Sequence, residues 1–177
     1  MALLLVAITI SLSSYRMQEP PAFIPPAVIR ESLPDPLDFV IPDEYRSLVE
    51  HWAAKEGVPV WIAARLFSVE STGDPLSGRW NRFAVSWMGA EGLAQLMPET
   101  RQYLEVRYNR GRPIDPFDPP QAIRFGLTYL ADLYELTGSW QTAVRSYNGG
   151  SGHWSNPRRY GDWNDESVTY SIRVVGR

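Results

Sequence analysis

The chain has 177 residues, a formal net charge of −3 at pH 7, seven tryptophans and no cysteine. That length suits one domain with a hydrophobic core, because domains commonly hold about 100–150 residues. The slightly acidic charge argues against nucleic acid as a partner, and the lack of cysteine excludes disulfides, thiolate metal sites and a lipid on an N-terminal cysteine.

Two segments precede the expected domain. The first, residues 1–19, opens with an almost wholly apolar run and has Ser-Leu-Ser at residues 11–13, small residues that a signal peptidase accepts. The run is shorter than the ~20 apolar residues of a membrane-spanning helix, and no Lys or Arg precedes it. It is either a degenerate or truncated secretory signal or a buried or disordered end, and we favour the export signal. The second segment, residues 20–42, carries seven of the fifteen prolines and is expected to form an extended tether.

The rest, residues 43–177, is expected to fold as a single, mainly α-helical domain. Apolar residues recur at helical spacing, and glycine or proline stands where helices end or begin. No stretch shows sustained alternation of apolar and polar residues, so the only β-structure expected is a small irregular hairpin within residues 76–85. The expected helices cover residues 43–57, 59–71, 98–108, 119–137, 139–148 and 165–175.

Capping residues mark two of these helix starts. Asp43 is expected to be the N-cap of the first helix. Asp118, followed by two prolines and Gln121, combines an N-cap, prolines in the first turn and a capping-box glutamine. The helix over residues 59–71 is mostly apolar, which is typical of a central, buried helix.

Three short motifs follow one another along the chain. Glu70-Ser71 closes the apolar helix, residues 86–98 contain Ser-x-x-Gly-Ala-x-Gly-Leu-x-Gln-x-Met-Pro, and residues 147–150 are Tyr-Asn-Gly-Gly. The first and last are common by themselves, whereas the long middle motif is specific. In order and spacing the three resemble the soluble lytic transglycosylase family, lysozyme-like enzymes that cut bacterial peptidoglycan between N-acetylmuramic acid and N-acetylglucosamine. The resemblance covers residues 43–177 and implies a single lysozyme-like domain with that activity.

Glu70 is the candidate catalytic acid. It follows the apolar run of residues 66–69, which predicts a carboxyl group in low-dielectric surroundings with a raised pKa. Glycosidases ordinarily use two carboxylates, but Asp74 lies in a Gly-Asp-Pro turn and Glu91 in a glycine-flanked, solvated turn. The resemblance implies that one suffices: in the family a single Glu protonates the leaving oxygen and then deprotonates the muramyl 6-hydroxyl, which gives a 1,6-anhydro product.

The resemblance also implies a substrate-binding set. Ser86 and Gln95 match hydrogen-bonding groups of the muramyl-binding region, and Met97 matches an apolar contact. Tyr147 and Asn148 match the Tyr-Asn motif, in which the phenol lies near the acid and orients it. Four of these residues also have an ordinary local interpretation: Ser86 as a turn residue, Gln95 as a helix or turn amide, Met97 as a core residue and Tyr147 as a buried ring.

Two further parts of the sequence, residues 76–83 and the C-terminal pair Glu166 and Tyr170, are not assigned to the catalytic step. Residues 76–83 form a longer stretch than the family usually has there. Trp80, with Arg79 and Arg82, is expected either to extend a glycan subsite or contact the peptide carboxylates, or to belong to a solvated loop. Glu166 and Tyr170 match a C-terminal pattern of the family, which we interpret as packing of the last helix.

The sequence therefore predicts a peptidoglycan lytic transglycosylase acting on glycan strands, exported to the periplasm or cell envelope or carried in a virion, with partners in an envelope machine or a virion. A muramidase that uses water and a non-catalytic wall-binding component are the alternatives. We expect no nucleic acid partner, no stable membrane span and no cofactor. No metal site is expected either, since His51 and His153 have no second ligand at metal-binding spacing.

Overall fold

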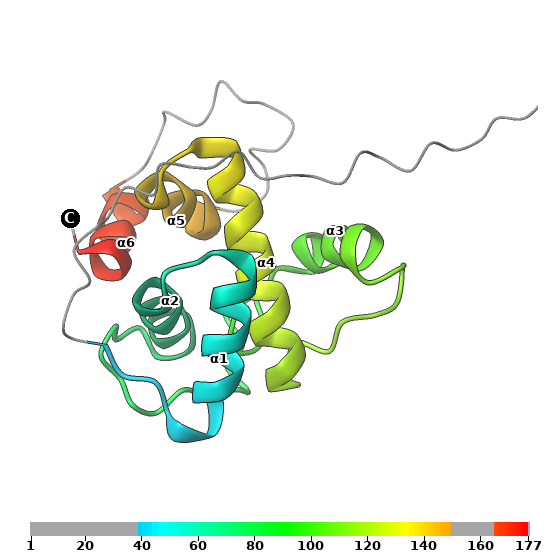
Figure 1. Cartoon of the computed structure of the whole chain (residues 1–177), viewed down its shortest axis with the longest axis horizontal. Coiled ribbons are helices and arrows are strands. Elements are labelled where there is room, and N and C mark those ends of the chain that lie inside the picture. The colour runs from blue at the N-terminus through cyan, green and yellow to red at the C-terminus, as the bar shows by residue number, and fades with distance from the viewer. Residues whose placement is uncertain (1–38, 150–164, 177) are drawn as a thin grey trace, which may run out of the picture. The chain divides into compact units, whose positions relative to one another are not determined.

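The computed structural model describes residues 39–149 and 165–176, so the expected signal segment and the expected tether up to residue 38 lie outside the described residues. The described part is helical, as expected, and its β-structure is limited to isolated bridges. The helices are α1 (Asp43–Glu56), α2 (Val60–Thr72), α3 (Pro98–Tyr108), α4 (Pro119–Thr137), α5 (Trp140–Gly149) and α6 (Asp165–Val175) (Figure 1).

Glycines end three of these helices because each adopts a left-handed backbone conformation that other residues avoid. Gly57, Gly73 and Gly138 have φ of 70°, 77° and 69°, and each N–H closes the last helical turn. The predicted ends of α1 and α4 are thereby confirmed.

The N-terminal caps differ from the predictions in detail. Pro42 is the N-cap of α1, and Asp43 is the first helical residue. The negative charge of Asp43 interacts favourably with the positive end of the helix dipole, but its side chain makes no capping hydrogen bond. Asp118 is the N-cap of α4, but its side chain makes no capping bond to the backbone. It accepts a hydrogen bond from the side chain of Gln121 at 2.9 Å instead, and Pro120, at one of the two positions that usually donate to an N-cap, has no N–H.

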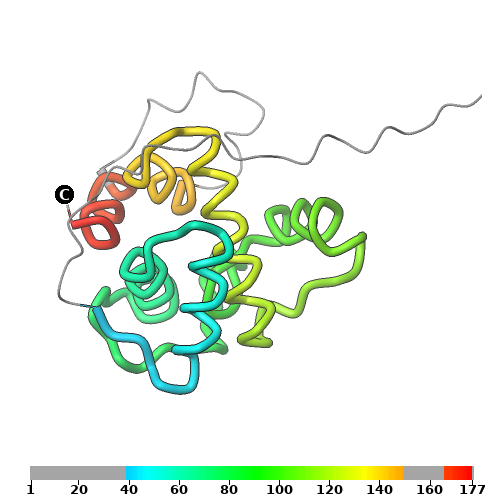
Figure 2. Tube along the Cα trace, viewed as in Figure 1, coloured from blue at the N-terminus to red at the C-terminus, as the bar shows by residue number. Residues whose placement is uncertain are grey.

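The core centres on α2, which confirms the expected central helix. Nine of its residues are buried, among them Trp61, Ile62, Leu66 and Phe67. α2 packs against α1 and α6, α4 packs against α1 and α5, and α5 packs against α6 (Figure 2). No helix in the described part of the chain combines the length and apolar character needed to cross a membrane.

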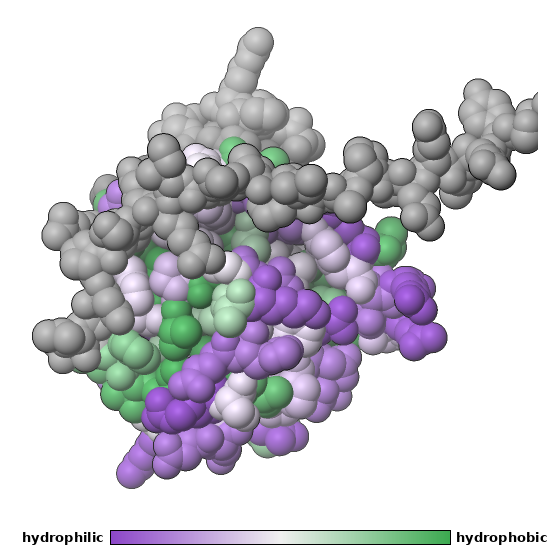
Figure 3. Space-filling view, in the orientation of Figure 1, coloured by the Kyte–Doolittle hydropathy of each residue, from purple (hydrophilic) through white to green (hydrophobic). Residues whose placement is uncertain are grey.

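The surface of α1 is hydrophilic on its solvent side. Glu44, Arg46 and Glu50 are exposed, and hydrophilic side chains cover much of the face seen in Figure 3. The opposite side of the helix buries Tyr45 and Val49 in the core. α1 is therefore a covering element of the bundle.

α3 lies on the outer side of α4 (Figure 1) and is attached to it by polar contacts. The hydroxyls of Tyr103 and Tyr108 both donate to the carboxylate of Asp132 on α4, at 2.9 and 2.5 Å. α3 itself buries Thr100 and Leu104. The carboxylate of Asp132 thus accepts hydrogen bonds from two side chains of α3.

Residues 73–97, the central loop, connect α2 to α3. The expected hairpin within residues 76–85 is wrong: the antiparallel bridges join Val85 to Glu91 and Glu91 to Leu96. The two bridges share Glu91, so the chain folds back on itself twice over a short distance. The structured part of the loop is therefore the motif region and not the stretch before it.

Trp80 is part of the core, which overturns both interpretations made from the sequence. Its ring stacks on Tyr45 with centroids 5.7 Å apart and packs against Phe67 at 5.6 Å. Only 7% of Trp80 is exposed, whereas Arg79 and Arg82 on either side are exposed. The apolar face of α1 and α2 gives the indole more burial than a glycan subsite could.

Candidate active site

Glu70 lies in the last turn of α2 and is partly buried. Burial raises the pKa of its carboxyl to about 7, and a hydrogen bond from Tyr170 lowers that pKa in part. The direction is the one that the preceding apolar run predicts, because desolvation disfavours the charged form. A carboxyl group with this pKa exists in both protonation states near neutral pH, so it can donate and accept a proton.

Tyr170 of α6 donates its hydroxyl to Oε1 of Glu70. The sequence analysis assigned this tyrosine to helix packing alone, so its contact with the acid was missed. The two residues are 100 positions apart in the chain, and α6 brings them together by packing against α2. The sequence signal for it was present in the C-terminal pattern that includes Glu166 and Tyr170.

Tyr147 of α5 makes a contact that the sequence did not predict. Its hydroxyl donates to the backbone carbonyl of Ala94 at 2.7 Å, and its ring lies 5.2 Å from that of Tyr129. Burial and, next, the charge of Glu70 raise the pKa of Tyr147, so the phenol lies within electrostatic reach of the acid. Tyr147 therefore attaches the central loop to α5, while Tyr170 makes the direct contact with Glu70.

Gly126 of α4 permits the close approach of three elements. A Cβ atom there would lie 2.8 Å from Cβ of Ala94, 3.1 Å from the ring of Phe67 and 3.4 Å from the hydroxyl of Tyr147. Any larger residue would push the central loop away from α2 and α5. Because Gly126 has no side chain, Ala94, and Gln95 beside it, can lie close to α4.

Gln95 holds the central loop in shape. Its backbone has φ of 45°, a left-handed conformation that is uncommon outside glycine. Its side-chain N–H group donates to the carbonyls of Ala84 at 3.0 Å and Gly92 at 2.9 Å. Among the described residues, no hydrogen bond to its amide oxygen is found, so that atom is available to another molecule.

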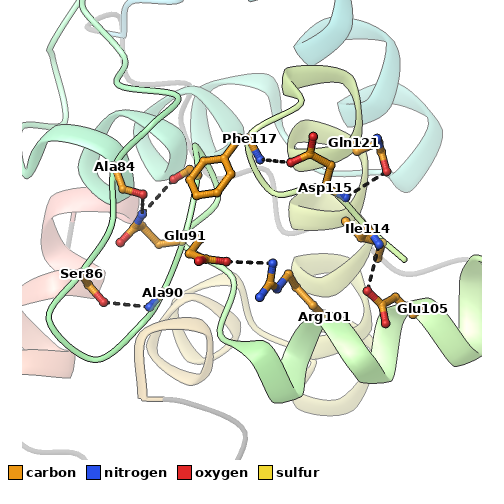
Figure 4. A network of polar contacts seen from close by, with 12 residues as sticks. Ala84, Ser86, Ala90, Glu91, Arg101, Glu105, Ile114, Asp115, Phe117 and Gln121 are labelled. Atoms are coloured by element: carbon orange, nitrogen blue, oxygen red, sulfur yellow. Dashed lines mark hydrogen bonds and ion pairs between the residues drawn. The ribbon is translucent and has the colours of Figure 1, made fainter. Parts of the chain in front are cut away.

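Ser86 closes a turn over residues 86–90, which we call the Trp87 turn. Its hydroxyl oxygen accepts from the N–H of Ala90 at 2.9 Å, and its own N–H donates to the carbonyl of Ala90 at 2.9 Å (Figure 4). Gly89, with φ of 88°, donates its N–H to the carbonyl of Ser86 at 3.0 Å. The local interpretation of Ser86 as a turn residue is therefore correct, whatever further role it has.

The other two carboxylates near the site are occupied by structural contacts. Asp74 accepts the N–H of Leu76 at 3.0 Å in an exposed turn, as expected. Glu91 is not in the solvated turn that the sequence suggested: it is partly buried and forms an ion pair with Arg101 of α3 at 2.8 Å (Figure 4). Glu70, whose pKa burial raises to about 7, has no ion-pair partner among the described residues.

The remaining candidates lie next to these residues. Met97, partly buried, is the N-cap of α3 and ends the central loop. Asn148, also partly buried, follows Tyr147 in α5. Within the described residues no three His, Asp or Glu side chains are grouped to hold a metal ion, and His153 lies outside the described residues.

Comparison with known proteins identifies relatives of the chain. The family model for the transglycosylase SLT domain matches residues 47–169. A transglycosylase of Enterobacteria phage PRD1 is 28% identical over 114 residues, which are 64% of this chain and 35% of the relative. A membrane-bound lytic murein transglycosylase C of Mannheimia succiniciproducens is 25% identical over 146 residues, 76% of this chain and 37% of the relative. The chain spans little more than a third of the length of these curated relatives.

Solved structures share the fold. An inactive mutant of the lytic transglycosylase Slt from Pseudomonas aeruginosa has a TM-score of 0.58 at 24% identity, covering 75% of this chain and 23% of that one. The 70-kDa soluble lytic transglycosylase of Escherichia coli has a TM-score of 0.54 at 22% identity, covering 74% and 21%. These similarities confirm the expected lysozyme-like fold.

Proposed function

This chain belongs to the transglycosylase SLT family, and from that premise we propose that it is a peptidoglycan lytic transglycosylase, which cleaves the β-1,4 bond between N-acetylmuramic acid and N-acetylglucosamine. The observation that carries the proposal is the state of Glu70, a partly buried carboxyl group with a pKa raised to about 7 and a tyrosine hydroxyl on one oxygen. The transglycosylase and murein transglycosylase names of the relatives support the choice of substrate.

In the first step, protonated Glu70 donates its proton to the glycosidic oxygen as the bond to the muramyl anomeric carbon breaks. A pKa of about 7 keeps the carboxyl largely protonated below neutral pH. The hydrogen bond from Tyr170 supports this step by fixing one carboxyl oxygen, which leaves the other to face the substrate. The proton transfer leaves Glu70 as a carboxylate.

In the second step, the same carboxylate accepts the proton of the muramyl 6-hydroxyl, whose oxygen attacks the anomeric carbon. One carbon–oxygen bond has broken and one has formed, Glu70 has recovered its proton, and no water is consumed. An internal nucleophile has a high effective concentration, so a second carboxylate is not needed. The ion pair of Glu91 with Arg101 and the turn contact of Asp74 are consistent with a mechanism that uses one carboxylate.

The binding set is proposed on the same grounds. Gln95 offers its amide oxygen to the substrate while its N–H group holds the loop. Ser86 and Asn148 supply further polar groups, and Met97 supplies an apolar contact at the start of α3. Tyr147 acts indirectly, because its hydroxyl is engaged with Ala94.

The proposed place of action is the cell envelope, reached by export, or a virion. Two names support it: one relative is described as membrane-bound and another belongs to a phage. Partners in an envelope machine or a phage particle follow as part of the same proposal.

Mass spectrometry of the products tests the reaction. Purified sacculi treated with the protein should release muropeptides that end in 1,6-anhydromuramic acid, which are lighter by one water than hydrolysis products. Reducing-end muramic acid as the main product would favour a muramidase. An absence of released fragments, with the protein bound to the sacculi, would favour a non-catalytic wall-binding component.

A further inference from the structure

The Trp87 turn presents an aromatic side chain to solvent. Trp87 is 94% exposed, more than any other large apolar side chain of the described residues. Phe83, Val85 and Met88 beside it are exposed as well. Contiguous apolar side chains that face water are uncommon in a folded domain unless they contact another molecule.

The turn that carries Trp87 has a defined shape. Three hydrogen bonds join Ser86 to Gly89 and Ala90 across it. Gly89 adopts the positive φ that the turn needs, and no atom lies within 4 Å of a Cβ built on it. The indole therefore projects from a preorganised support, which reduces the entropy lost when a ligand binds.

Hydrogen bonds and bridges link this turn to a residue near the catalytic acid. Val85, next to the turn, pairs with Glu91, and Gln95 bonds the carbonyls on either side of that pair. Ala94 accepts the hydroxyl of Tyr147, whose phenol lies within electrostatic reach of Glu70. The exposed turn and the residue that contacts Tyr147 thus belong to the same bridged loop.

The charges around the turn limit the class of ligand. Residues 75–90 contain Arg79 and Arg82, both exposed, and no Asp or Glu. Glu91, which follows, is paired with Arg101. The charges nearest the turn in sequence thus favour a ligand with an apolar face for the indole and with neutral or negative groups.

From these observations we propose that Trp87 is a stacking platform for a pyranose ring of the peptidoglycan strand, beyond the two sugars at the cleaved bond. A pyranose ring has one face of C–H groups, which matches a flat indole, and peptidoglycan carries carboxylates that suit the arginines. This inference rests on the proposed function, since it concerns the same substrate. A lipid surface is the other ligand with apolar and anionic parts, but a single turn in the loop that also carries Gln95 and Ala94 favours the glycan.

Binding to purified sacculi tests the platform without cleavage. In the Glu70→Gln background, the bound fraction is measured by centrifugation over a range of sacculus concentrations. Trp87→Ala should weaken binding by about tenfold, the effect of losing one aromatic contact, and Trp87→Tyr should keep most of it. The matched control is Val106→Ala, which removes an exposed apolar side chain from α3 and should leave binding unchanged.

Anionic phosphatidylglycerol vesicles provide the second arm. Unchanged binding of Trp87→Ala to sacculi overturns the platform, as does a parent protein that does not sediment with sacculi. Trp87-dependent binding to the vesicles, with sacculus binding unaffected, assigns the turn to a membrane instead. The proposed function is judged separately by the 1,6-anhydro products of the wild-type protein, so the two proposals can fail independently.

Discussion

The acid and the central loop are held in place by different means. Glu70 lies on α2, most of whose residues are buried and apolar. The hydroxyl of Tyr170 from α6 donates a hydrogen bond to its carboxyl group. The central loop buries Trp80, Leu93 and Leu96, but its motif region is shaped by hydrogen bonds to backbone carbonyls, mainly from Gln95.

This difference separates two physical requirements of the site. A carboxyl group that must hold a proton at neutral pH needs desolvation, which only packed helices provide. A wall that contacts a polar, extended ligand needs exposed polar and aromatic groups, which a loop can carry if its backbone is fixed. Changes to the first region are therefore expected to alter proton transfer, and changes to the second to alter shape.

The largest effect is expected for Glu70→Gln. The amide keeps the size of the side chain but cannot donate the proton, so release of fragments from sacculi should fall by about 10²–10⁴-fold, the usual contribution of a general acid–base group. Circular dichroism should show the same helix content as the wild type. Sacculus lysis at the wild-type rate would remove Glu70 from the mechanism.

The same variant also reports the cost of burying the acid. The pKa of Glu70 rises from 4.5 to about 7 in the folded protein, so folding favours the protonated form and stability is lost as pH rises through this interval. At pH 8 Glu70→Gln should unfold on the order of 5 °C above the wild type, and at pH 4 the two should unfold together. An equal gap at both pH values would mean that ionisation of Glu70 is not the cause.

A pair of glycine variants should separate packing from backbone strain in the central loop. Gly92 has φ of 77°, and a Cβ on it would lie 1.8 Å from the carbonyl oxygen of Pro116. Gly92→Ala should therefore lower the free energy of unfolding by about 3 kcal/mol or more. Gly89→Ala shares the positive φ but meets no atom within 4 Å, so its cost should be about 1 kcal/mol. Urea unfolding of both variants makes the comparison, and equal costs would show that the contact with Pro116 is not decisive.

Gln95→Ala should loosen the loop while leaving the acid intact. It removes two hydrogen bonds to backbone carbonyls, which together stabilise the fold by about 1–3 kcal/mol. We expect a lower rate of sacculus lysis with an unchanged pH profile, since α2 and α6 are not altered. A shifted profile would contradict the separation of the two regions.

The smallest effect distinguishes the two tyrosines near the acid. Tyr170→Phe removes a hydrogen bond that lowers the pKa of Glu70, so the alkaline limb of the pH–activity profile should move to higher pH. Tyr147→Phe should leave this limb nearly in place, because its hydroxyl bonds Ala94. It should instead weaken turnover and lower stability by about 1–3 kcal/mol. A shift of equal size in both variants would show that Tyr147 also orients the acid.

Much of the helical fold follows from local sequence signals. Gly57 and Gly138 end helices because the left-handed conformation is local to one residue, and proline marks the start of α3 for the same kind of reason. The central loop was predicted less well. Its bridges at Glu91 depend on contacts between backbone segments, which residue type alone does not encode.

The site was predictable only as far as its motifs reach. Glu70 stands out because the apolar run beside it is adjacent in sequence, whereas the contact of Tyr170 with it depends on how α6 packs against α2. Trp80 was expected in a glycan subsite or a solvated loop and not in the core, because its partners Tyr45 and Phe67 are distant in sequence. Residues whose roles depend on long-range packing are the ones that single-sequence reasoning misassigned.

The attachment of α3 has a consequence for motion. α3 buries Thr100 and Leu104 and is otherwise attached to α4 through the carboxylate of Asp132, so separating it from the bundle exposes little apolar area and costs a small part of the global unfolding free energy. Its amide hydrogens should therefore exchange with solvent sooner than those of α2. Because Met97 begins α3 and Arg101 on it holds Glu91, each such local opening frees one side of the central loop while α2 stays folded.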